Sequence, residues 1–471
     1  MVFSSSTFLL VFFPLTLLLY YLIGVLWTKN VTVKNSILLL ASLVFYAWGE
    51  PVYIVLMILS ILFNFTIGQD LDDSLSEGRA RQAKVLFVCA LVFNLGVLGF
   101  FKYADFLVEN LNRIPGLEIG LPSLPLPIGI SFYTFQTMSY LIDLYRRKIR
   151  VQNNLLSFAL YIALFPQLIA GPIVKYIDIE DQLLNRKETP VKYARGMARF
   201  VVGLSKKLLL ANTLGSVYSS IQAMEPGSVS ALTAWVGILC YTLQIYFDFS
   251  GYSDMAIGLG KMFGFTFNEN FNYPYIASSI TDFWRRWHIS LSTWFRDYVY
   301  IPLGGNRCST PRIIFNLSVV WTLTGLWHGA AWNFVLWGVY YGILLILEKF
   351  VLEDILQKTP APIRHVLTLL LVMCGWVLFS APTLPDALLY FKAMFGGAAG
   401  FADANGLYLL TTNLPLLLIG IFCSLPLYKK LFAGHEKVIS RMKLAVYPVL
   451  FALCIVYMVS ETYNPFLYFR F

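Results

Sequence analysis

The chain has 471 residues, of which 58% are hydrophobic and only 13% are charged, and it carries a net charge of +9. Soluble domains carry about 25% charged residues, so this composition excludes an ordinary soluble protein and indicates an all-α, polytopic membrane protein. The basic residues lie mostly between apolar stretches, where membrane topology and lipid headgroups explain them, so a nucleic-acid partner is not expected.

Apolar stretches without Asp, Glu, Lys or Arg follow one another along the chain, and several reach the about 20 residues that span a bilayer. They occupy residues 7–27, 37–48, 51–67, 85–101, 128–142, 155–170, 228–247, 313–347, 366–385, 406–428 and 444–460. We expect the first to be a retained helix rather than a signal peptide, because no positive charge precedes it. We expect about 11 or more transmembrane or re-entrant helices in one integral-membrane domain. This domain covers 1–471, with core motifs in 125–350 and additional transmembrane helices in 363–463.

Basic segments mark the cytoplasmic ends of membrane helices. Lys29 and Lys34 follow the first apolar stretch, four cations lie in 146–150, and five lie in 429–443 against the single Glu436. When all three segments are placed in the cytoplasm, threading the chain leaves both ends on the other side of the membrane. The sequence therefore predicts a multi-pass protein with both termini extracytoplasmic.

Two segments between the apolar stretches are long and more polar. Residues 171–227 carry cations among apolar residues and are expected to form amphipathic helices at the cytoplasmic interface. Residues 268–312 carry tryptophans and phenylalanines at helical spacing with arginines between them, which is typical of an interfacial helix. Between the two segments, Asp248 and Asp254 are interpreted as helix caps or turn residues.

Residues 313–347 form one uncharged run that contains His328. At 1.5 Å per residue, a single helix of this length would exceed a hydrocarbon core of about 30 Å, so a break at 329–331 is expected. A histidine in such a run is either a hydrogen-bonded structural residue or a functional one, and residue chemistry leaves both open. Neither the four histidines nor the six scattered cysteines show metal-ligand spacing, so no metal is expected.

Motifs along roughly the first 350 residues carry a resemblance to a known family. These motifs are Met1–Ser5, Tyr46–Pro51, Ile130–Gln136, Phe165–Pro172, Tyr246–Asp254, Phe283–Ser292, Trp294–Tyr298, Pro302–Arg307 and Gly325–Ala330. In content, order and spacing they resemble the membrane-bound O-acyltransferase (MBOAT) family, in the branch of the membrane subunit of alginate O-acetyltransferase. The last third of the chain matches only loosely.

The resemblance implies an MBOAT fold of helices around a central funnel, in the bacterial cytoplasmic (inner) membrane. By position, His328 corresponds to the family's catalytic histidine and His288 to its second functional histidine. It also implies acetyl-CoA, or another acyl thioester, as the donor, with no bound cofactor. Extracytoplasmic SGNH-type acetyltransferase partner proteins would pass the acetyl group to a polysaccharide, either an alginate-like exopolysaccharide or a cell-wall glycan.

Residues near the two histidines are expected to bind the substrates. Trp327 and Trp332 can wall a dry pocket beside His328. The basic, aromatic segment around His288 suits the phosphates of a CoA donor. Its candidate residues are Arg285, Arg286, Arg296, Asp297, Asn306 and Arg307. For Arg285 and Arg286, each taken alone, contact with lipid phosphates is the alternative.

Three other functions stay open. The related branch that exports D-alanine for teichoic acid uses a carrier-protein thioester. A transporter or flippase would also need polar residues at membrane depth, although neither inverted repeats nor matching pairs of broken helices are evident. A membrane scaffold could anchor a secreted enzyme and have no chemistry of its own.

Overall fold

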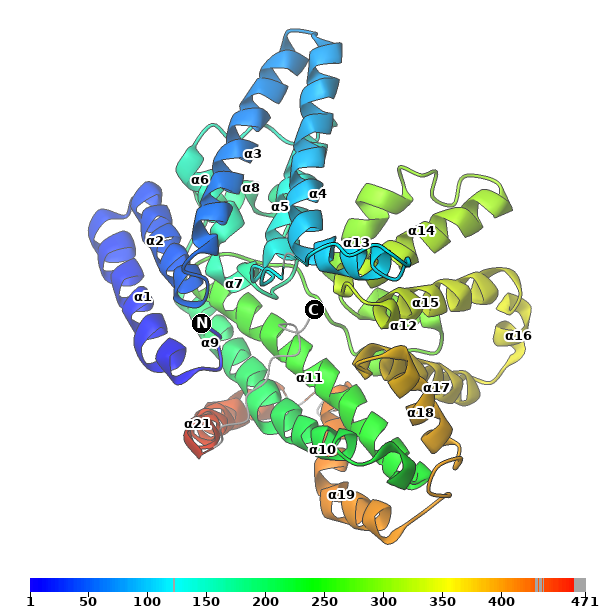
Figure 1. Ribbon diagram of the computed structural model, residues 1–471. Helices are drawn as coiled ribbons and strands as arrows, with labels where there is room; N and C mark the ends of the chain where they lie inside the picture. Colours follow the sequence, from blue (N-terminus) through cyan, green and yellow to red (C-terminus); the bar gives the residue numbers. More distant parts are fainter. Residues whose placement is uncertain (122, 428–430, 432–433, 435, 461–471) are drawn as a thin grey trace. The chain divides into compact units, whose positions relative to one another are not determined.

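The computed structural model describes residues 1–121, 123–427, 431, 434 and 436–460. All regular elements in these residues are helices (Figure 1), which confirms the predicted all-α fold class. Ten helices in the described part are long and apolar enough to cross a membrane, so the chain is a multi-pass membrane protein. The chain forms two compact units, here called the first unit (Met1–Phe200 with Ser253–Asn268) and the second unit (Val201–Tyr252 with Glu269–Phe471).

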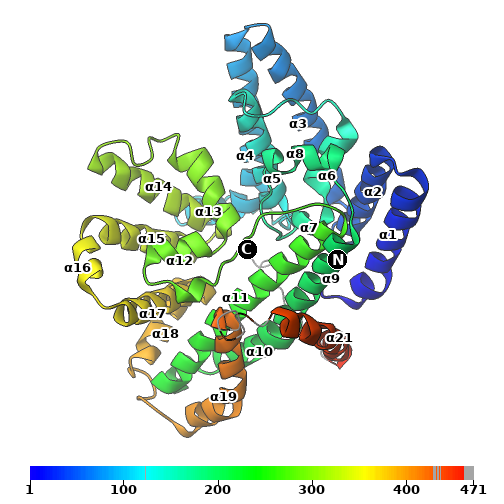
Figure 2. The ribbon, with the colours of Figure 1, turned by 180° about the vertical axis from the view of Figure 1, so that it is seen from behind.

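The first unit contains the N-terminal helices. They are η1 (Phe8–Phe12), α1 (Phe13–Leu19), η2 (Tyr20–Thr28), α2 (Val31–Gly49), α3 (Tyr53–Ser76), α4 (Ala80–Leu111), α5 (Ile130–Tyr145), α6 (Leu155–Ala163), α7 (Phe165–Leu168) and α8 (Tyr176–Asn185). η1, α1 and η2 run on as one span, and α3 and α4 form a long hairpin in both views (Figures 1 and 2). The apolar stretches 128–142 and 155–170 form shorter helices that are buried in protein.

Two long helices, α9 (Pro190–Ser205) and α11 (Ala231–Met262), contribute residues to both units. The remaining helices belong to the second unit. They are η3 (Lys206–Ala211), α10 (Asn212–Gln222), η4 (Pro226–Ser228), η5 (Pro274–Ile276), α12 (Ile280–Arg286), α13 (Ile289–Phe295), η6 (Arg296–Tyr300), α14 (Thr310–His328), α15 (Trp332–Phe350), α16 (Glu353–Lys358), α17 (Ala361–Ser380), α18 (Leu384–Met394), α19 (Ala404–Ser424) and α21 (Glu436–Ser460).

The prediction of interfacial helices over 171–227 is wrong for most of that segment. α9, η3 and α10 form one continuous helix, Pro190–Gln222, whose apolar window is long enough to cross a membrane. Its cations are tolerated at this depth because carboxylates neutralise two of them. In the first unit, the Arg199 guanidinium donates to Asp254 at 2.9 and 2.7 Å. In the second unit, the Lys207 ammonium lies 2.6 Å from Asp248.

The same two ion pairs overturn the interpretation of Asp248 and Asp254 as caps or turn residues. Both aspartates lie inside α11, many residues from either of its ends. Helical capping uses residues at the ends of a helix, so these carboxylates cannot act in that way. Their partners come from the preceding long helix, which a local sequence pattern does not reveal.

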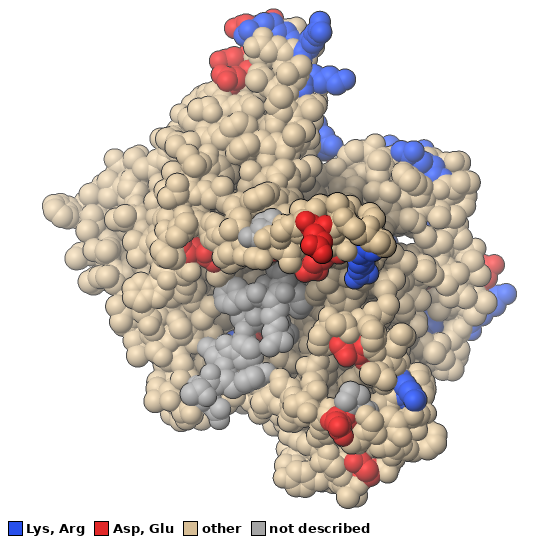
Figure 3. Space-filling model, viewed as in Figure 1, with Lys and Arg blue, Asp and Glu red and all other residues tan. Residues whose placement is uncertain are grey.

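One group of exposed charged residues of the first unit lies at the turn between α3 and α4. Figure 3 shows Lys, Arg, Asp and Glu side chains together at this tip. Arg147, which follows α5, lies 2.6 Å from Asp72 and also donates to Ser76 at 3.2 Å. The basic segment 146–150 and the tip of the α3–α4 hairpin therefore lie at the same end of the first unit.

The predicted break of the apolar run 313–347 is confirmed. α14 and α15 are joined by 329–331 and lie side by side (Figures 1 and 2). Two glycines permit this close approach: a Cβ atom on Gly325 would strike the carbonyl oxygen of Phe334, and one on Gly338 would strike that of Trp321. Small residues at such crossings let membrane helices pack backbone against backbone. The hairpin places His328 at its turn.

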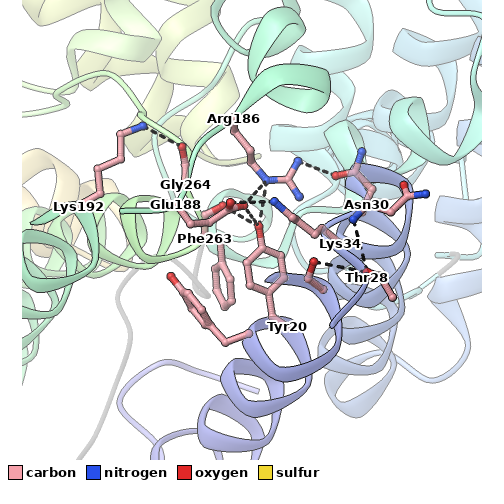
Figure 4. Close-up of polar contacts among 12 residues, drawn as sticks. Tyr20, Thr28, Asn30, Lys34, Arg186, Glu188, Lys192, Phe263 and Gly264 are labelled. Atoms are coloured by element: carbon pink, nitrogen blue, oxygen red, sulfur yellow. Dashed lines mark hydrogen bonds and ion pairs between the residues drawn. The ribbon is translucent and has the colours of Figure 1, made fainter. Parts of the chain in front are cut away.

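A buried ionic network holds together three segments of the first unit (Figure 4). Glu188 accepts hydrogen bonds from the Tyr20 hydroxyl at 2.6 Å and from the Lys34 ammonium at 2.8 Å. The Arg186 guanidinium donates to the Tyr20 oxygen at 3.1 Å and to Asn35 at 2.6 Å. The network therefore links η2 and α2 to the segment after α8.

We expect Glu188→Gln to destabilise the first unit at neutral pH. Burial opposes ionisation of Glu188, but hydrogen bonds from Lys34 and Tyr20 outweigh it and hold the pKa of this carboxyl below its usual value. Since the folded-state pKa lies below the unfolded one, the ionised carboxylate stabilises the fold above about pH 4.5, and this contribution is lost as the pH falls through the folded pKa. The loss should be about 1–3 kcal/mol at pH 7.

Thermal unfolding in detergent at pH 7 and pH 3.5 measures this effect. The variant should unfold at a lower temperature than the wild type at pH 7, and the difference should shrink at pH 3.5. Glu77→Gln is the matched control, because Glu77 is 60% exposed in its pair with Arg79 and should matter little. Equal unfolding temperatures of wild type and Glu188→Gln at pH 7 would refute the stabilising role of the network.

Candidate active site

His328 lies in a box of aromatic rings. It is the last residue of α14 and is 4% exposed. Its ring centre is 5.0 Å from those of Trp327 and Trp337 and 5.3 Å from that of Phe379, and each of these rings meets it nearly edge to face. Such contacts fix an imidazole in orientation and keep bulk water from its faces. The site therefore supplies a firmly held, dehydrated histidine.

The turn that carries His328 is tightly packed. A side chain at Gly329 would collide with the ring of Phe334, which itself packs against Phe379 at 5.1 Å. The Asn333 side-chain amide donates to the carbonyl oxygen of Ala381 at 3.0 Å, so the start of α15 is tied to the end of α17. The position of His328 is therefore set by α14, α15 and α17 together.

His288 lies at the junction of α12 and α13 and is 1% exposed. Its backbone has φ of 44° and ψ of 54°, a left-handed conformation that costs free energy for any residue except glycine and that occurs preferentially at functional sites. Its Nδ1 lies 3.2 Å from the side-chain oxygen of Asn270, and its ring contacts Phe249 at 4.6 Å. Burial lowers the pKa of His288 to about 3, so its imidazole is neutral at physiological pH.

The indole of Trp327 connects the two histidines. Its ring centre is 6.0 Å from that of His288 and 5.0 Å from that of His328. All three residues belong to the second unit. The structure thus brings together the two histidines and one of the two tryptophans that the sequence singled out.

Trp332 is more exposed than Trp327. It is the first residue of α15 and is 50% exposed, whereas Trp327 is 4% exposed. Besides Trp327, the rings of Trp337 and Phe379 contact His328. A role of Trp332 in substrate binding stays a prediction.

The polar residues predicted to bind the donor lie mostly at the surface. Arg285 and Arg307 are exposed and form no ion pair with any residue that the structure describes. Arg286 is engaged by Asp282 at 2.8 Å, and Arg296 by the predicted Asp297 at 2.8 Å.

Asn306 completes the predicted set. It is exposed and accepts a hydrogen bond from Tyr300 at 2.7 Å. Among the residues that the structure describes, neither Asn306 nor the four arginines form a hydrogen bond with His288 or His328. Donor binding by these residues therefore stays a prediction.

Four residues that sequence reasoning missed surround the histidines: Asn270, Phe249, Trp337 and Phe379. The run Asn-Glu-Asn-Phe-Asn before α12 was a visible signal for Asn270, because polar residues seldom lie so densely beside apolar helices. No comparable signal marks the three aromatic residues, since their role depends on contacts between distant helices.

The chain is similar to known proteins along most of its length. A model of the membrane-bound O-acyltransferase family matches residues 144–382. The chain is 44% identical over 432 residues to the probable alginate O-acetylase AlgI of Pseudomonas aeruginosa, covering 90% of this chain and 81% of that protein. It is 46% identical to the protein of the same name from Azotobacter vinelandii, over 89% of this chain and 83% of that one.

The name of a third relative gives a different acceptor. The peptidoglycan O-acetyltransferase of Helicobacter pylori is 35% identical, over 84% of this chain and 80% of that protein. The region of the family match contains both histidines and Asn270. These similarities confirm the resemblance inferred from the motifs.

Proposed function

Because this chain belongs to the membrane-bound O-acyltransferase family, we propose that it transfers an acetyl group from a cytoplasmic thioester to an extracytoplasmic polysaccharide. Acyl transfer at a membrane is the activity of the family, and acetyl-CoA is the donor we propose. The observation that carries the chemistry is the burial of His288 and His328 against the indole of Trp327. The names of the relatives, alginate O-acetylase and peptidoglycan O-acetyltransferase, support acetyl as the group and a polysaccharide as the acceptor.

In the proposed reaction His328 acts as the general base. Its imidazole takes the proton of the acceptor hydroxyl as the hydroxyl oxygen attacks the thioester carbonyl carbon. The new ester C–O bond forms, the C–S bond breaks, and the leaving sulfur receives the proton. General-base catalysis of this kind contributes about 10²–10⁴-fold, and the aromatic box around His328 protects the thioester from water. His288 positions either the thioester or the acceptor.

The proposed orientation places the acetyl donor on the cytoplasmic side. Its support is the contact of Arg147 with Asp72, because it gathers the basic segment 146–150 and the charged α3–α4 tip at one end of the first unit. Both termini would then be extracytoplasmic in the inner membrane, although 461–471 and part of 429–443 lie outside the described residues. We also propose that 1–471 works as a single enzyme domain, with SGNH-type partner proteins on the extracytoplasmic side.

The function can be tested in cells and in vesicles. A deletion strain should lose O-acetyl esters from its surface polysaccharide, as measured by mass spectrometry. Loss of D-alanyl esters instead would indicate the teichoic-acid reaction. Vesicles that contain the purified protein should consume radiolabelled acetyl-CoA. If a partner protein transfers the label equally well without this chain, the chain is a scaffold. If unreacted acetyl-CoA accumulates inside the vesicles, the chain is a transporter.

We expect the exposed arginines Arg285 and Arg307 to contribute most to donor binding. Among the residues that the structure describes, no carboxylate pairs with Arg285 or Arg307, whereas Arg286 pairs with Asp282 and Arg296 with Asp297. The double variant Arg285→Gln/Arg307→Gln should raise the KM for acetyl-CoA about tenfold at low salt. Exposed charge pairs are screened by ions, so the difference from the wild type should shrink at 0.5 M salt.

Arg286→Gln/Arg296→Gln is the matched control, since it removes the same charge from arginines that already have partners. It should change the KM less than the first double variant does. Donor kinetics that stay unchanged in both, with only a loss of expressed protein, would mean that these arginines serve topology or bind lipid phosphates.

A further inference from the structure

Asn270 fixes the junction of α12 and α13 through hydrogen bonds, from a position 18 residues before His288. It is 1% exposed and lies in the irregular segment between α11 and η5. Its backbone oxygen accepts from the Ile289 amide at 3.0 Å, and its side-chain oxygen accepts from the Ser290 amide at 3.1 Å and the Ser290 hydroxyl at 2.9 Å. The same side-chain oxygen lies 3.2 Å from Nδ1 of His288. These bonds hold His288 in its left-handed backbone conformation.

The contacts of Asn270 determine which nitrogen of His288 carries the proton. The Ser290 backbone amide can only donate, so the Asn270 atom that faces it is the carbonyl oxygen and not the amide nitrogen. An oxygen of this kind can only accept from His288. Nδ1 of the neutral imidazole must therefore carry its proton, and Nε2 carries the lone pair.

We propose that Asn270 is a positioning residue that keeps His288 in the Nδ1–H tautomer, so that Nε2 accepts a hydrogen bond from a hydroxyl group of the acceptor. This inference rests on the proposed acyl transfer and decides between the two roles left to His288. A neutral Nε2 without a proton cannot donate to the carbonyl oxygen of the thioester, whereas it can receive a hydroxyl proton in a hydrogen bond.

The hydroxyl that donates to His288 differs from the one that reacts. His328 removes the proton of the reacting hydroxyl, and that proton cannot also be donated to His288. A polysaccharide offers a second hydroxyl on the same sugar unit, so in direct transfer to the polysaccharide one hydroxyl donates to Nε2 of His288 and aligns the acceptor, while another reacts at His328.

The tautomer can be measured without any acyl transfer. With ¹⁵N-labelled histidine the full chain gives signals from only four residues, and His288→Gln identifies those of His288. In the wild type, NMR of the protein in lipid should show a protonated Nδ1 on His288, and Asn270→Ala should give a mixture of tautomers. A protonated Nε2 in the wild type would overturn the proposal, whatever the enzyme does.

Kinetics test the consequence for the reaction. Asn270→Ala should raise the KM for the acceptor about tenfold to hundredfold, the effect of a lost orienting hydrogen bond, and leave the KM for acetyl-CoA within about twofold. Asn270→Asp keeps the shape and the accepting oxygen, but its negative charge favours the imidazolium form of His288. In the Asn270→Asp variant, the fall of kcat/KM on the acid side of the pH profile should therefore begin at higher pH than in the wild type.

Asn413→Ala is the control for removing an asparagine from an apolar helix, because the Asn413 side-chain amide donates to Leu409 within its own helix α19 at 2.9 Å. It should leave both KM values and the tautomer unchanged. If Asn270→Asp kept the wild-type pH profile, or if Asn270→Ala left the KM for the acceptor unaltered, Asn270 would be structural only. If the wild type transferred no acyl group at all, the proposed function would fail while the NMR result still decided the tautomer.

Discussion

His328→Ala is expected to lower acyl transfer by at least about 10²–10⁴-fold, the contribution of a general base, and to leave a folded protein. The imidazole packs against the neutral rings of Trp327, Trp337 and Phe379, so its removal strands no charge among these three neighbours. Removing a polar group from apolar surroundings need not destabilise a protein. The measurement is acetyl transfer from labelled acetyl-CoA by detergent-purified protein, together with its thermal unfolding.

His328→Gln separates the two interpretations that residue chemistry left open. Gln can form hydrogen bonds but cannot take up a proton, so a structural histidine would be partly replaced by it and a general base would not. His365 provides the matched control, because its Nδ1 donates to the carbonyl oxygen of Ala277 at 3.0 Å and its role is visibly structural. We expect His365→Gln to stay active and His328→Gln to be inactive. Substantial transfer by His328→Gln would contradict the assignment of the base.

The parts of the fold that the sequence predicts well are those decided by length and polarity. The break at 329–331 could be predicted because one helix over 313–347 would be too long for a bilayer. In the structure α14 ends at His328 and α15 begins at Trp332, on either side of this break. Nine of the eleven apolar stretches coincide with long helices for the same reason. Polarity alone predicted an interfacial position for Pro190–Gln222. A helix whose cations are neutralised by carboxylates of a neighbouring helix has the same sequence pattern as an interfacial helix.

The candidate site is only half predictable from sequence. His288 and His328 stand out because ionisable groups are rare beside apolar helices, and the structure connects them through Trp327. The polar run 268–272 marks the segment of Asn270 but not the role of this residue, since that role depends on the left-handed backbone of His288 and on which atom faces Ser290. Backbone conformation of this kind has no periodic signal in the sequence.

The ion pair between Lys207 and Asp248 is expected to be the most sensitive polar contact of the second unit. The two side chains are 4% and 2% exposed, and their charged atoms are 2.6 Å apart. Removing one partner leaves the other as an uncompensated buried charge, which costs about 3–5 kcal/mol. Asp248→Ala and Lys207→Met should therefore each lower the unfolding temperature strongly. Since Phe249 follows Asp248 and contacts the ring of His288 at 4.6 Å, both variants should also lose activity.

The double variant Lys207→Met/Asp248→Leu shows whether the charge or the contact matters. An apolar pair of similar volume can replace a buried ion pair with little loss of stability, so the double variant should unfold close to the wild-type temperature. Arg199 and Asp254 form the control pair, because at 23% and 13% exposure water can still reach their charges and Asp254→Asn should cost less. If the double variant were as unstable as the single ones, Lys207 and Asp248 would act through separate contacts and not as a pair. If it recovered stability but not activity, the ion pair would be needed to hold Phe249 against His288, and the stability of the fold and the geometry of the site would be separable at this position.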